Sequence, residues 1–558
     1  MPSLRTSALL LALLCAVSFL PAAEEFAEIQ AKVVSFKLDN GLTVILYRRG
    51  DAPVIACVTY VKVGSTDEQP GITGIAHQLE HLAFKGTPNI GTKDYAAEQA
   101  AFAGIDKLYA EIQSFEQELP AGAREGFQTL LAKSATTGSA AGADKTEQQA
   151  AALAAECEKA GQPLKDDRKA ALLRYVQTFA ERVRGAEQYV EQNQYANVID
   201  RNGGTGLNAF TSADRTVYHV SLPANKLELW ASLETDRYLN TVPRQIEKEK
   251  QVVLEERRMR SETSPFGKLY EAFLGKAFTV HPYGTPTIGR REDIIGYTRA
   301  KVLDFYRRHY VPENTIVAVT GDIDVEQTRK LLSDYFGRIP KSPAPDRQIP
   351  VEPAQDGERR VEVKFPAQPI LLVGFHVPER NHPDTPALEV LDEVASSGRS
   401  SRLSTRLVKT GKANSAGCWL SPGARFPRLF IFSTEPPEGV ALDDLEANLL
   451  AEIEKLKQEP PTAEEMKRVL TGYRAGVLRS LRSNLGLGMA LADYQALSGD
   501  WHSLFHDIQL IGAVKPDQVT AAAAKYLTKQ NRTVGRLVPL ETAATPAGPD
   551  KVLGVPVK

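Results

Sequence analysis

Strand patterns alternate along the chain with stretches that carry the 3.6-residue spacing of an amphipathic helix. Residues 42–47 and 54–63 are nearly continuous apolar runs, and a helical pattern follows over about residues 71–84. The same order returns later in the chain, where strand patterns within residues 359–376 precede a helical pattern at 385–395. The repeated order predicts an internal duplication, with two α+β halves.

A proline-rich segment and an insertion interrupt this duplication. Residues 339–357 hold five prolines within fourteen positions and predict a semi-rigid linker. Residues 93–193 are rich in Ala, Glu, Gln and Lys at helical spacing, and they predict a helical hairpin inserted into the first half. A coiled-coil surface for a partner is the alternative for this insertion. The halves then span residues 33–338 and 358–541, and a flexible tail is expected at 542–558.

The first residues have the pattern of an export signal. Arg5 precedes an apolar run over residues 7–20, and small residues lead up to Glu24, which predicts a signal peptide of residues 1–23. The alternative is a membrane anchor, but the run is shorter than the ~20 residues that a span needs. We therefore expect an exported protein without a membrane span, which would be periplasmic if its source is a Gram-negative bacterium.

Composition narrows the classes of function. The 558-residue chain is 42% hydrophobic and 24% charged, which is ordinary for a globular protein and excludes wholesale disorder. Its 67 basic and 69 acidic side chains leave a net charge of −2, so the overall charge gives no reason to expect binding to nucleic acid. The 4 cysteines form no CxxC pair, which rules out a disulfide framework and a cysteine-built zinc site.

The run His77-Gln-Leu-Glu80-His81 carries the strongest chemical signal. On a helix, His77 and His81 are four residues apart, so both imidazoles leave the same face about 6 Å apart. That separation lets two ring nitrogens bind one Zn²⁺, and Glu80 can flank the ion as a general base. With 9 histidines in 558 residues, chance yields only about 0.01 such runs. Two histidines placed by accident are therefore the weaker interpretation.

A third ligand is expected on a second helical stretch, over residues 245–260. Glu249 and Glu256 are seven apart and share one face with Val252 and Val253, but ~10.5 Å along the axis separates them. Both cannot bind one ion, so one should be a ligand and the other should orient a ligand or solvent. Taken alone, the stretch would be read as a solvated charged helix.

The HxxEH order and its surroundings resemble one family of peptidases. This order is inverted relative to HExxH, and it resembles the pitrilysin/insulinase family of inverzincins. Further stretches that look like the family are residues 63–68, 84–87, 208–211, 214–218, 281–284 and 310–315. Apart from the insertion, the resemblance covers about residues 33–541.

The resemblance implies a role for each matching residue. His77 and His81 match the histidine ligands, Glu80 the general base, Glu256 the distal ligand and Glu249 its supporting glutamate. Residues Asn208, Ala209, Phe210 and Thr211 fall where the family has an edge strand beside the metal, on which a peptide substrate pairs as an added strand.

The resemblance also implies a fold and a reaction. We expect a clam-like α+β metallopeptidase of two homologous halves, each an antiparallel-rich sheet packed with helices. Its reaction would be zinc-dependent endoproteolysis of peptides or unfolded segments, without a covalent intermediate.

The second half departs from the family pattern. Active members, or their sibling subunits, carry an Arg and a Tyr seven apart that bind substrate and stabilise the oxyanion. Anchoring on Gly411 places these positions at Leu407 and Asn414, so the pair is missing here. We therefore expect a catalytic subunit that a sibling chain, or a second copy in a homodimer, completes. The rival interpretation is a non-catalytic scaffold of the same family, which would be expected to have a degraded ligand set.

Overall fold

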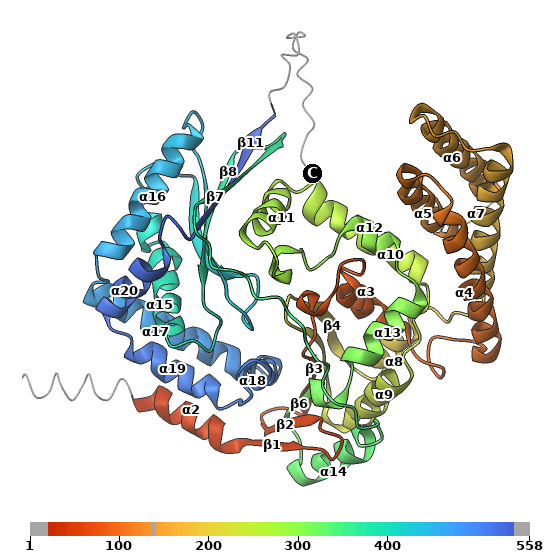
Figure 1. Cartoon of the computed structure of the whole chain (residues 1–558). Coiled ribbons are helices and arrows are strands. Elements are labelled where there is room, and N and C mark those ends of the chain that lie inside the picture. Colours follow the sequence, from red (N-terminus) through yellow and green to blue (C-terminus); the bar gives the residue numbers. More distant parts are fainter. Residues whose placement is uncertain (1–19, 137–139, 541–558) are drawn as a thin grey trace, which may run out of the picture.

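The computed structural model of the chain describes residues 20–136 and 140–540 (Figure 1). Most of the predicted signal peptide, residues 1–19, and the predicted tail lie outside these residues. The described part contains two β-sheets and many helices, which confirms the predicted α+β class with two antiparallel-rich halves. Among the described helices, none combines the length and the apolar character needed to cross a bilayer.

The first half is built on a six-stranded sheet. In sheet order its strands are β1 (Val33–Lys37), β2 (Thr43–Arg48), β6 (Thr315–Gly321), β3 (Val54–Val61), β5 (Thr216–Pro223) and β4 (Thr205–Thr211). All neighbouring strands are antiparallel except β2 and β6. β4 ends the sheet, and no strand among the described residues pairs with its outer edge.

The second half is built on a five-stranded sheet. In sheet order its strands are β7 (Arg359–Phe365), β11 (Arg532–Pro539), β8 (Ile370–Val377), β10 (Arg428–Glu435) and β9 (Ser415–Ser421). Only β7 and β11 run parallel. Residues 340–358, which connect the halves, form no helix or strand.

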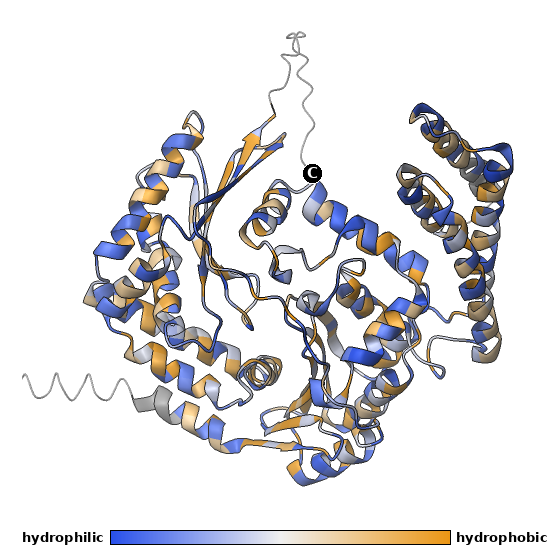
Figure 2. Cartoon of the chain, viewed as in Figure 1, coloured by the Kyte–Doolittle hydropathy of each residue, from blue (hydrophilic) through white to orange (hydrophobic). Residues whose placement is uncertain are grey.

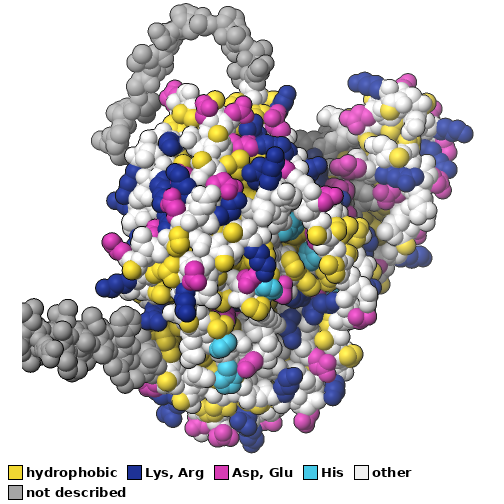
Figure 3. All heavy atoms as spheres, turned by 60° about the vertical axis from the view of Figure 1, so that its left-hand side comes forward, with side chains coloured by type: hydrophobic (Ala, Val, Ile, Leu, Met, Phe, Trp, Pro, Cys, Tyr) yellow, Lys and Arg dark blue, Asp and Glu magenta, His cyan; other side chains and the backbone are white. Residues whose placement is uncertain are grey.

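Most helices lie on one face of the sheet of their own half, whereas one helix from each half contacts the sheet of the opposite half. The helices of the first half are α2 (Leu20–Lys32), α3 (Ile75–Leu82), α8 (Gln194–Arg201), α9 (Leu227–Asn240), α10 (Ile246–Arg257), α11 (Pro265–Ala277), α12 (Arg291–Ile295), α13 (Arg299–His309) and α14 (Val325–Phe336). Those of the second half are α15 (Thr385–Ser396), α16 (Leu442–Gln458), α17 (Ala463–Arg482), α18 (Asn484–Ser498), α19 (Ser503–Ala513) and α20 (Pro516–Tyr526). Figure 2 shows hydrophobic and hydrophilic residues alternating along these helices, and Figure 3 shows basic and acidic side chains interspersed over the face of the molecule that it draws.

The remaining face of each sheet is covered by a helix of the opposite half. Leu487 and Leu491 of α18 pack on the first sheet, in one cluster with Val58 and Ile316. Phe273 and its neighbours on α11 pack in the same way on the second sheet. This exchange buries apolar surface of both sheets and fixes the two halves against each other.

The insertion contains four helices, where the sequence predicted a hairpin. They are α4 (Tyr95–Gln117), α5 (Ala121–Thr136), α6 (Ala140–Lys159) and α7 (Asp166–Glu187). They share a core of their own and stand to one side of the first half (Figure 1). The hairpin prediction was incomplete because alanine is a weak marker of which helix faces are buried.

A buried ion pair attaches the insertion to the first half. The Nε of Arg244 lies 2.8 Å from a carboxylate oxygen of Glu98 on α4, and both side chains are fully buried. The same guanidinium donates hydrogen bonds to the backbone carbonyls of Lys85, Thr87 and Ile90. These contacts tie the start of the insertion to the segment that follows α3.

The connecting segment is also held in place. Glu352 accepts hydrogen bonds from the backbone N–H groups of Thr279, Val280 and His281, at 2.8–3.1 Å. Burial works against the charge of Glu352, but these donors lower its pKa to about 2. The carboxylate therefore fastens the proline-rich connection to the first half.

Candidate metal centre and active site

Helix α3 presents the HxxEH run inside the first half. Gly74, its N-cap, has φ +88°, and a Cβ there would overlap the carbonyl oxygen of Ile288, so only glycine fits. The carboxylate of Glu68 accepts hydrogen bonds from the N–H groups of Gly74 and Ala76 at 2.6 and 2.9 Å. It satisfies two open donors at the start of the helix, so these hydrogen bonds hold the first turn in place.

Three side chains meet where α3 and α10 approach each other. The Nε2 atoms of His77 and His81 lie 3.6 and 3.7 Å from the same Oε2 of Glu256. One ligand atom from each residue falls within 4.8 Å of the others. A tetrahedral Zn²⁺ with bonds of about 2.0–2.1 Å needs ligand atoms about 3.4 Å apart, so this group has the dimensions of a zinc site.

The surroundings of His77 favour the neutral imidazole that a metal ligand requires. Burial lowers the pKa of His77 to about 3, with smaller contributions from His81 and Arg260. The ring is therefore neutral near pH 7, which is the form that binds a metal. Two histidines and one carboxylate also make one of the common donor sets of catalytic zinc, which keeps a fourth position open.

Glu249 contacts the opposite side of His81. Its Oε2 lies 3.3 Å from His81 Nδ1, and its Oε1 lies 2.6 Å from the Nζ of Lys85. Burial works to raise the pKa of Glu249, but the hydrogen bonds from His81 and Lys85 lower it. A charged acceptor at Nδ1 favours the tautomer with Nε2 free, which turns that nitrogen toward Glu256. Glu256 thus approaches the Nε2 atoms of both histidines, whereas Glu249 approaches Nδ1 of His81. Helical spacing alone did not show which glutamate makes which contact.

Glu80 lies beside this group and is held by Thr211 at the end of β4. The Oγ1 of Thr211 donates a hydrogen bond of 2.6 Å to Oε2 of Glu80. Burial raises the pKa of Glu80 above its ordinary value, and the Thr211 hydrogen bond opposes that rise. A carboxylate with a raised pKa beside a metal site is suited to accept a proton.

For the other three residues of the predicted substrate strand, the described part of the structure contains no hydrogen bond to Glu80. Asn208 is exposed, Ala209 is buried and Phe210 is half-buried with the guanidinium of Arg215 over its ring. All three lie on the sheet edge that β4 forms, where their backbone can pair with an added strand.

Models of one peptidase family match both halves. The model described as insulinase, peptidase family M16, matches residues 43–115 and 183–290. The model described as the peptidase M16 inactive domain matches residues 296–473. The chain belongs to the M16 peptidase family. Residues 116–182, which the first model skips, contain most of the helical insertion of this M16 chain.

Known proteins support the same family. The zinc protease PqqE of Helicobacter pylori is 30% identical over 361 residues, which are 62% of this chain and 79% of that protein. The crystal structure of a protease from Helicobacter pylori has a TM-score of 0.68 at 24% identity, and the match covers 91% of this chain and 100% of that one.

The fold of this chain also matches one part of a longer protein. The periplasmic protease PqqL from Escherichia coli matches with a TM-score of 0.60 at 16% identity. The match covers 91% of this M16 chain but only 47% of PqqL. One copy of the fold described here therefore corresponds to about half of that protein.

Leu407 and Asn414, the positions at which the sequence predicted the family's Arg and Tyr to be missing, both make structural contacts in the second half of this M16 chain. Leu407 is fully buried in the core of the second half. The Asn414 side chain donates to the backbone carbonyl of Pro436, at 3.1 Å. Nearby, the buried Arg402 forms an ion pair with the half-buried Glu465. These residues support the second half itself.

Two basic residues at the site had no role assigned from the sequence. Arg260 lies 2.8 Å from Oε1 of Glu256, and Lys85 pairs with Glu249 as described above. The spacing of four residues between Glu256 and Arg260 is a signal that could have revealed the first contact. Lys85 gave no such signal, because its partner lies on another helix.

The insertion borders the metal centre of this M16 chain. A groove of about 770 Å³ lies between the insertion and α10. Its lining includes Val252, Glu256, Met259 and Arg260 from the first half, and Thr136 and Glu187 from the insertion. The insertion therefore forms one wall of a groove that reaches Glu256.

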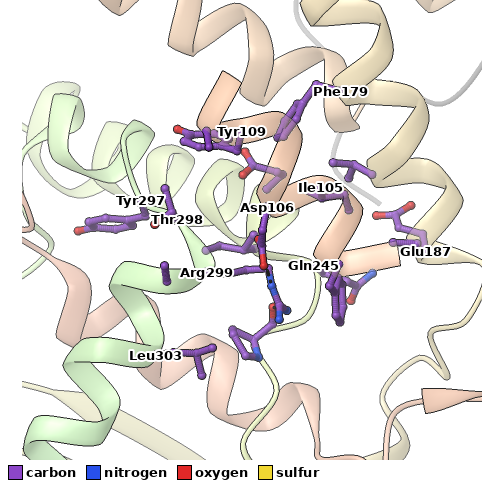
Figure 4. Close-up of a pocket in the computed structure, with 18 of the residues that line it drawn as sticks. Ile105, Asp106, Tyr109, Phe179, Glu187, Gln245, Tyr297, Thr298, Arg299 and Leu303 are labelled. Carbon is purple, nitrogen blue, oxygen red and sulfur yellow. Dashed lines mark hydrogen bonds and ion pairs between the residues drawn. The ribbon is translucent and has the colours of Figure 1, made fainter. Parts of the chain in front are cut away.

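A separate cavity lies farther from the metal centre (Figure 4). It measures about 460 Å³ and lies between α4 and α7 of the insertion, α13 and the start of α10. Figure 4 shows Arg299 beside Asp106, and these side chains lie 3.5 Å apart. From Gln245, which lines this cavity, to Glu256 the helix rises about 16 Å. The cavity is therefore distinct from the group around Glu256.

Proposed function

We propose that this chain is a zinc-dependent endopeptidase that hydrolyses peptides or unfolded segments, with Glu80 as its general base. The observation that carries the proposal is the convergence of His77, His81 and Glu256 with Glu80 at their side. The M16 family membership and the relatives named zinc proteases support it.

Each residue at the centre has a task in this proposal. His77, His81 and Glu256 would hold Zn²⁺, and Glu249 would keep His81 in its binding orientation. When bound, the ion supplies a Lewis acid that polarises the scissile carbonyl and lowers the pKa of water toward ~7. Glu80 accepts the proton of the attacking water and passes it to the departing amine.

Substrate would bind along β4. Within the part of the chain that the structure describes, no strand pairs with the outer edge of β4, so an extended peptide can add to the sheet through backbone hydrogen bonds. Thr211 ends β4 and contacts Glu80, so a peptide running along the strand would bring its backbone to the proposed base.

A second chain would complete the enzyme. The sequence predicts that Leu407 and Asn414 stand where the family has its Arg and Tyr, and the match to PqqL covers 47% of that protein. Both observations favour a sibling subunit that supplies the Arg and Tyr; a homodimer is the second possibility. The predicted signal peptide would send the chain out of the cytoplasm, to the periplasm in a Gram-negative source.

A non-catalytic scaffold is the competing function. Its support is the description of the model that matches residues 296–473, an inactive domain. That segment contains none of the four residues at the metal centre, so a second half without catalytic groups is compatible with an active first half.

Hydrolysis of a mixed library of quenched peptides tests the proposal. The chain is assayed alone and together with subunits that co-purify from its own organism, after chelation and after zinc is restored. We expect turnover that chelation removes and zinc restores. A co-purified assembly that binds no zinc and cleaves no peptide would favour the scaffold.

A further inference from the structure

The cavity shown in Figure 4 lies where the insertion meets the first half. Its volume of about 460 Å³ is within the usual range for ligand pockets. Its walls come from α4 and α7 of the insertion, from α13 and from the start of α10. The insertion therefore supplies two of the four walls, and without it this part of the first half would be open surface.

Buried aromatic rings form part of the lining. Phe102, Tyr109 and Phe179 are buried, and the ring centroids of Tyr109 and Phe179 lie 5.9 Å apart. Figure 4 shows the side chain of Ile105 near them. The Tyr109 hydroxyl donates to the side chain of Gln128 at 3.0 Å, so this polar group already has a partner. These side chains therefore offer apolar surface to a guest.

The guanidinium of Arg299 at this cavity makes few good hydrogen bonds. Its Nε is buried and donates no hydrogen bond among the described residues. The Asp106 carboxylate beside it lies 3.5 Å away, beyond the usual range of about 2.7–3.2 Å (Figure 4). Its Nη1 reaches the carbonyl oxygen of Pro243 only at 3.3 Å. A guest that brings an acceptor oxygen would use donors that the protein leaves open.

Burial has a measurable consequence for this group. It lowers the pKa of Arg299 from its ordinary value, although the nearby Asp106 opposes the change. The surrounding protein groups therefore do not fully replace the hydration that the guanidinium loses.

The remaining charges at this cavity favour an uncharged guest. Besides Asp106 and Arg299, the lining contains three charged side chains. Glu247 is paired with the buried Lys250 at 2.8 Å. The half-buried Glu187 also lines the groove beside α10, and the Arg307 side chain is exposed, so water can reach both. A charged guest would lose its hydration without gaining a free counter-charge, whereas a neutral guest loses little.

A strained residue stands in the wall at the start of α10. Gln245, the N-cap of this helix, has φ +55°, and Asn193 is the only other described non-glycine residue with a positive φ. Strain of this kind is uncommon, and it concentrates at ligand sites and switch regions. A guest would lie against Gln245 and Ile246, at the start of the helix that carries Glu249 and Glu256.

We propose that this cavity binds a small uncharged molecule that is mainly apolar and carries a hydrogen-bond acceptor such as a carbonyl oxygen. The apolar part packs on Phe102, Tyr109 and Phe179, and the acceptor takes a hydrogen bond from Arg299. The site is separate from the proposed reaction, because it shares no residue with the group around Glu256 and its occupancy is measured without turnover.

Benzophenone is a suitable probe, because it has two apolar rings and one carbonyl acceptor. Diphenylmethane lacks the acceptor, and para-benzoylbenzoate adds a negative charge. Calorimetric titration of the full chain with each compound gives the three dissociation constants. Irradiation attaches bound benzophenone to nearby C–H bonds, so digestion and mass spectrometry locate the bound probe.

We expect benzophenone to bind about tenfold more tightly than diphenylmethane, the factor for one hydrogen bond from a charged donor, and para-benzoylbenzoate to bind most weakly. Arg299→Met should remove the advantage of benzophenone and leave diphenylmethane unchanged. Arg174→Met is the matched control, because Arg174 also places its guanidinium over an aromatic ring, that of Tyr175, but does not line this cavity. It should change none of the three dissociation constants.

A variant that fills the cavity tests the position of the site. Ile105→Trp places a larger ring in the lining, so both uncharged probes should lose at least about tenfold in affinity while thermal unfolding shows that the fold survives. The benzophenone label should fall within residues 102–113, 179–190, 243–247 or 297–307. Absence of benzophenone binding, a label outside these segments, tighter binding of para-benzoylbenzoate, or unchanged binding in both Arg299→Met and Ile105→Trp would overturn the inference.

Discussion

Removal of the Glu249 carboxylate tests how the metal centre is positioned. Glu249 would not touch the ion, yet its Oε2 lies 3.3 Å from Nδ1 of His81. Glu249→Ala removes the only charged acceptor that contacts this nitrogen among the described residues. It also leaves Lys85, which is 22% exposed, without its partner at 2.6 Å.

The expected loss can be worked from this geometry. At 3.3 Å the bond is longer than the usual 2.9–3.0 Å, but its acceptor is charged, so about 1.5–3 kcal/mol depends on it. Since about 1.4 kcal/mol is a factor of ten, zinc affinity should fall about 10–100-fold. Glu249→Gln keeps an acceptor oxygen without its charge, so its loss should be smaller.

Competition with a chromophoric zinc chelator at neutral pH measures this affinity. Glu255→Ala is the matched control, because Glu255 lies on the same helix but is exposed, and its one ion pair among the described residues is with Arg258. Thermal unfolding of the metal-free variants checks that the fold survives. If zinc affinity is the same in Glu249→Ala as in Glu255→Ala, Glu249 does not position His81.

Three further changes test other contacts. Thr211→Val removes a hydrogen bond that lowers the pKa of Glu80, so this pKa should rise further. Because Glu80 must be ionised to act, the acidic limb of the kcat/KM profile should move up by about one pH unit. Arg244→Met leaves Glu98 buried without a partner, so chemical denaturation should show a loss of about 3–5 kcal/mol. Glu352→Gln should lower the free energy of unfolding by about 2 kcal/mol at neutral pH. Folding lowers the pKa of Glu352 from 4.5 to about 2, so the difference in unfolding free energy between variant and unchanged chain should disappear as pH falls from 4.5 toward 2.

Each of these has a result that would contradict it. An unmoved acidic limb in Thr211→Val would mean that another group titrates there. For Arg244, the double variant with Glu98→Leu should recover part of the loss, and no recovery would show that the ion pair is not the cause. A pH-independent difference between Glu352→Gln and the unchanged chain would exclude the proposed linkage.

Local sequence patterns were enough to predict many of the strands and helices. The strand runs at 42–47 and 54–63 became β2 and β3, because a continuous apolar run fits a strand that is covered on both faces. The exchange of α11 and α18 between the halves was not predictable, since an apolar helix face does not specify which sheet it will cover.

The site was predictable where its residues lie on one helix. Helical spacing predicts that His77, Glu80 and His81 lie close together, and in the structure Glu256 approaches Nε2 of His81 whereas Glu249 approaches its Nδ1. The Arg244–Glu98 pair joins residues 146 positions apart, and no local pattern marks such a contact.

The central claim is that Glu80 acts beside a zinc ion in this chain, and one paired measurement tests it most directly. The unchanged chain and Glu80→Gln are purified with their associated subunits, and zinc per chain and peptide turnover are determined on the same samples. We expect one zinc per chain in both samples and turnover only where Glu80 is present. Near-full turnover by Glu80→Gln, or an unchanged chain that binds no zinc, would contradict the claim.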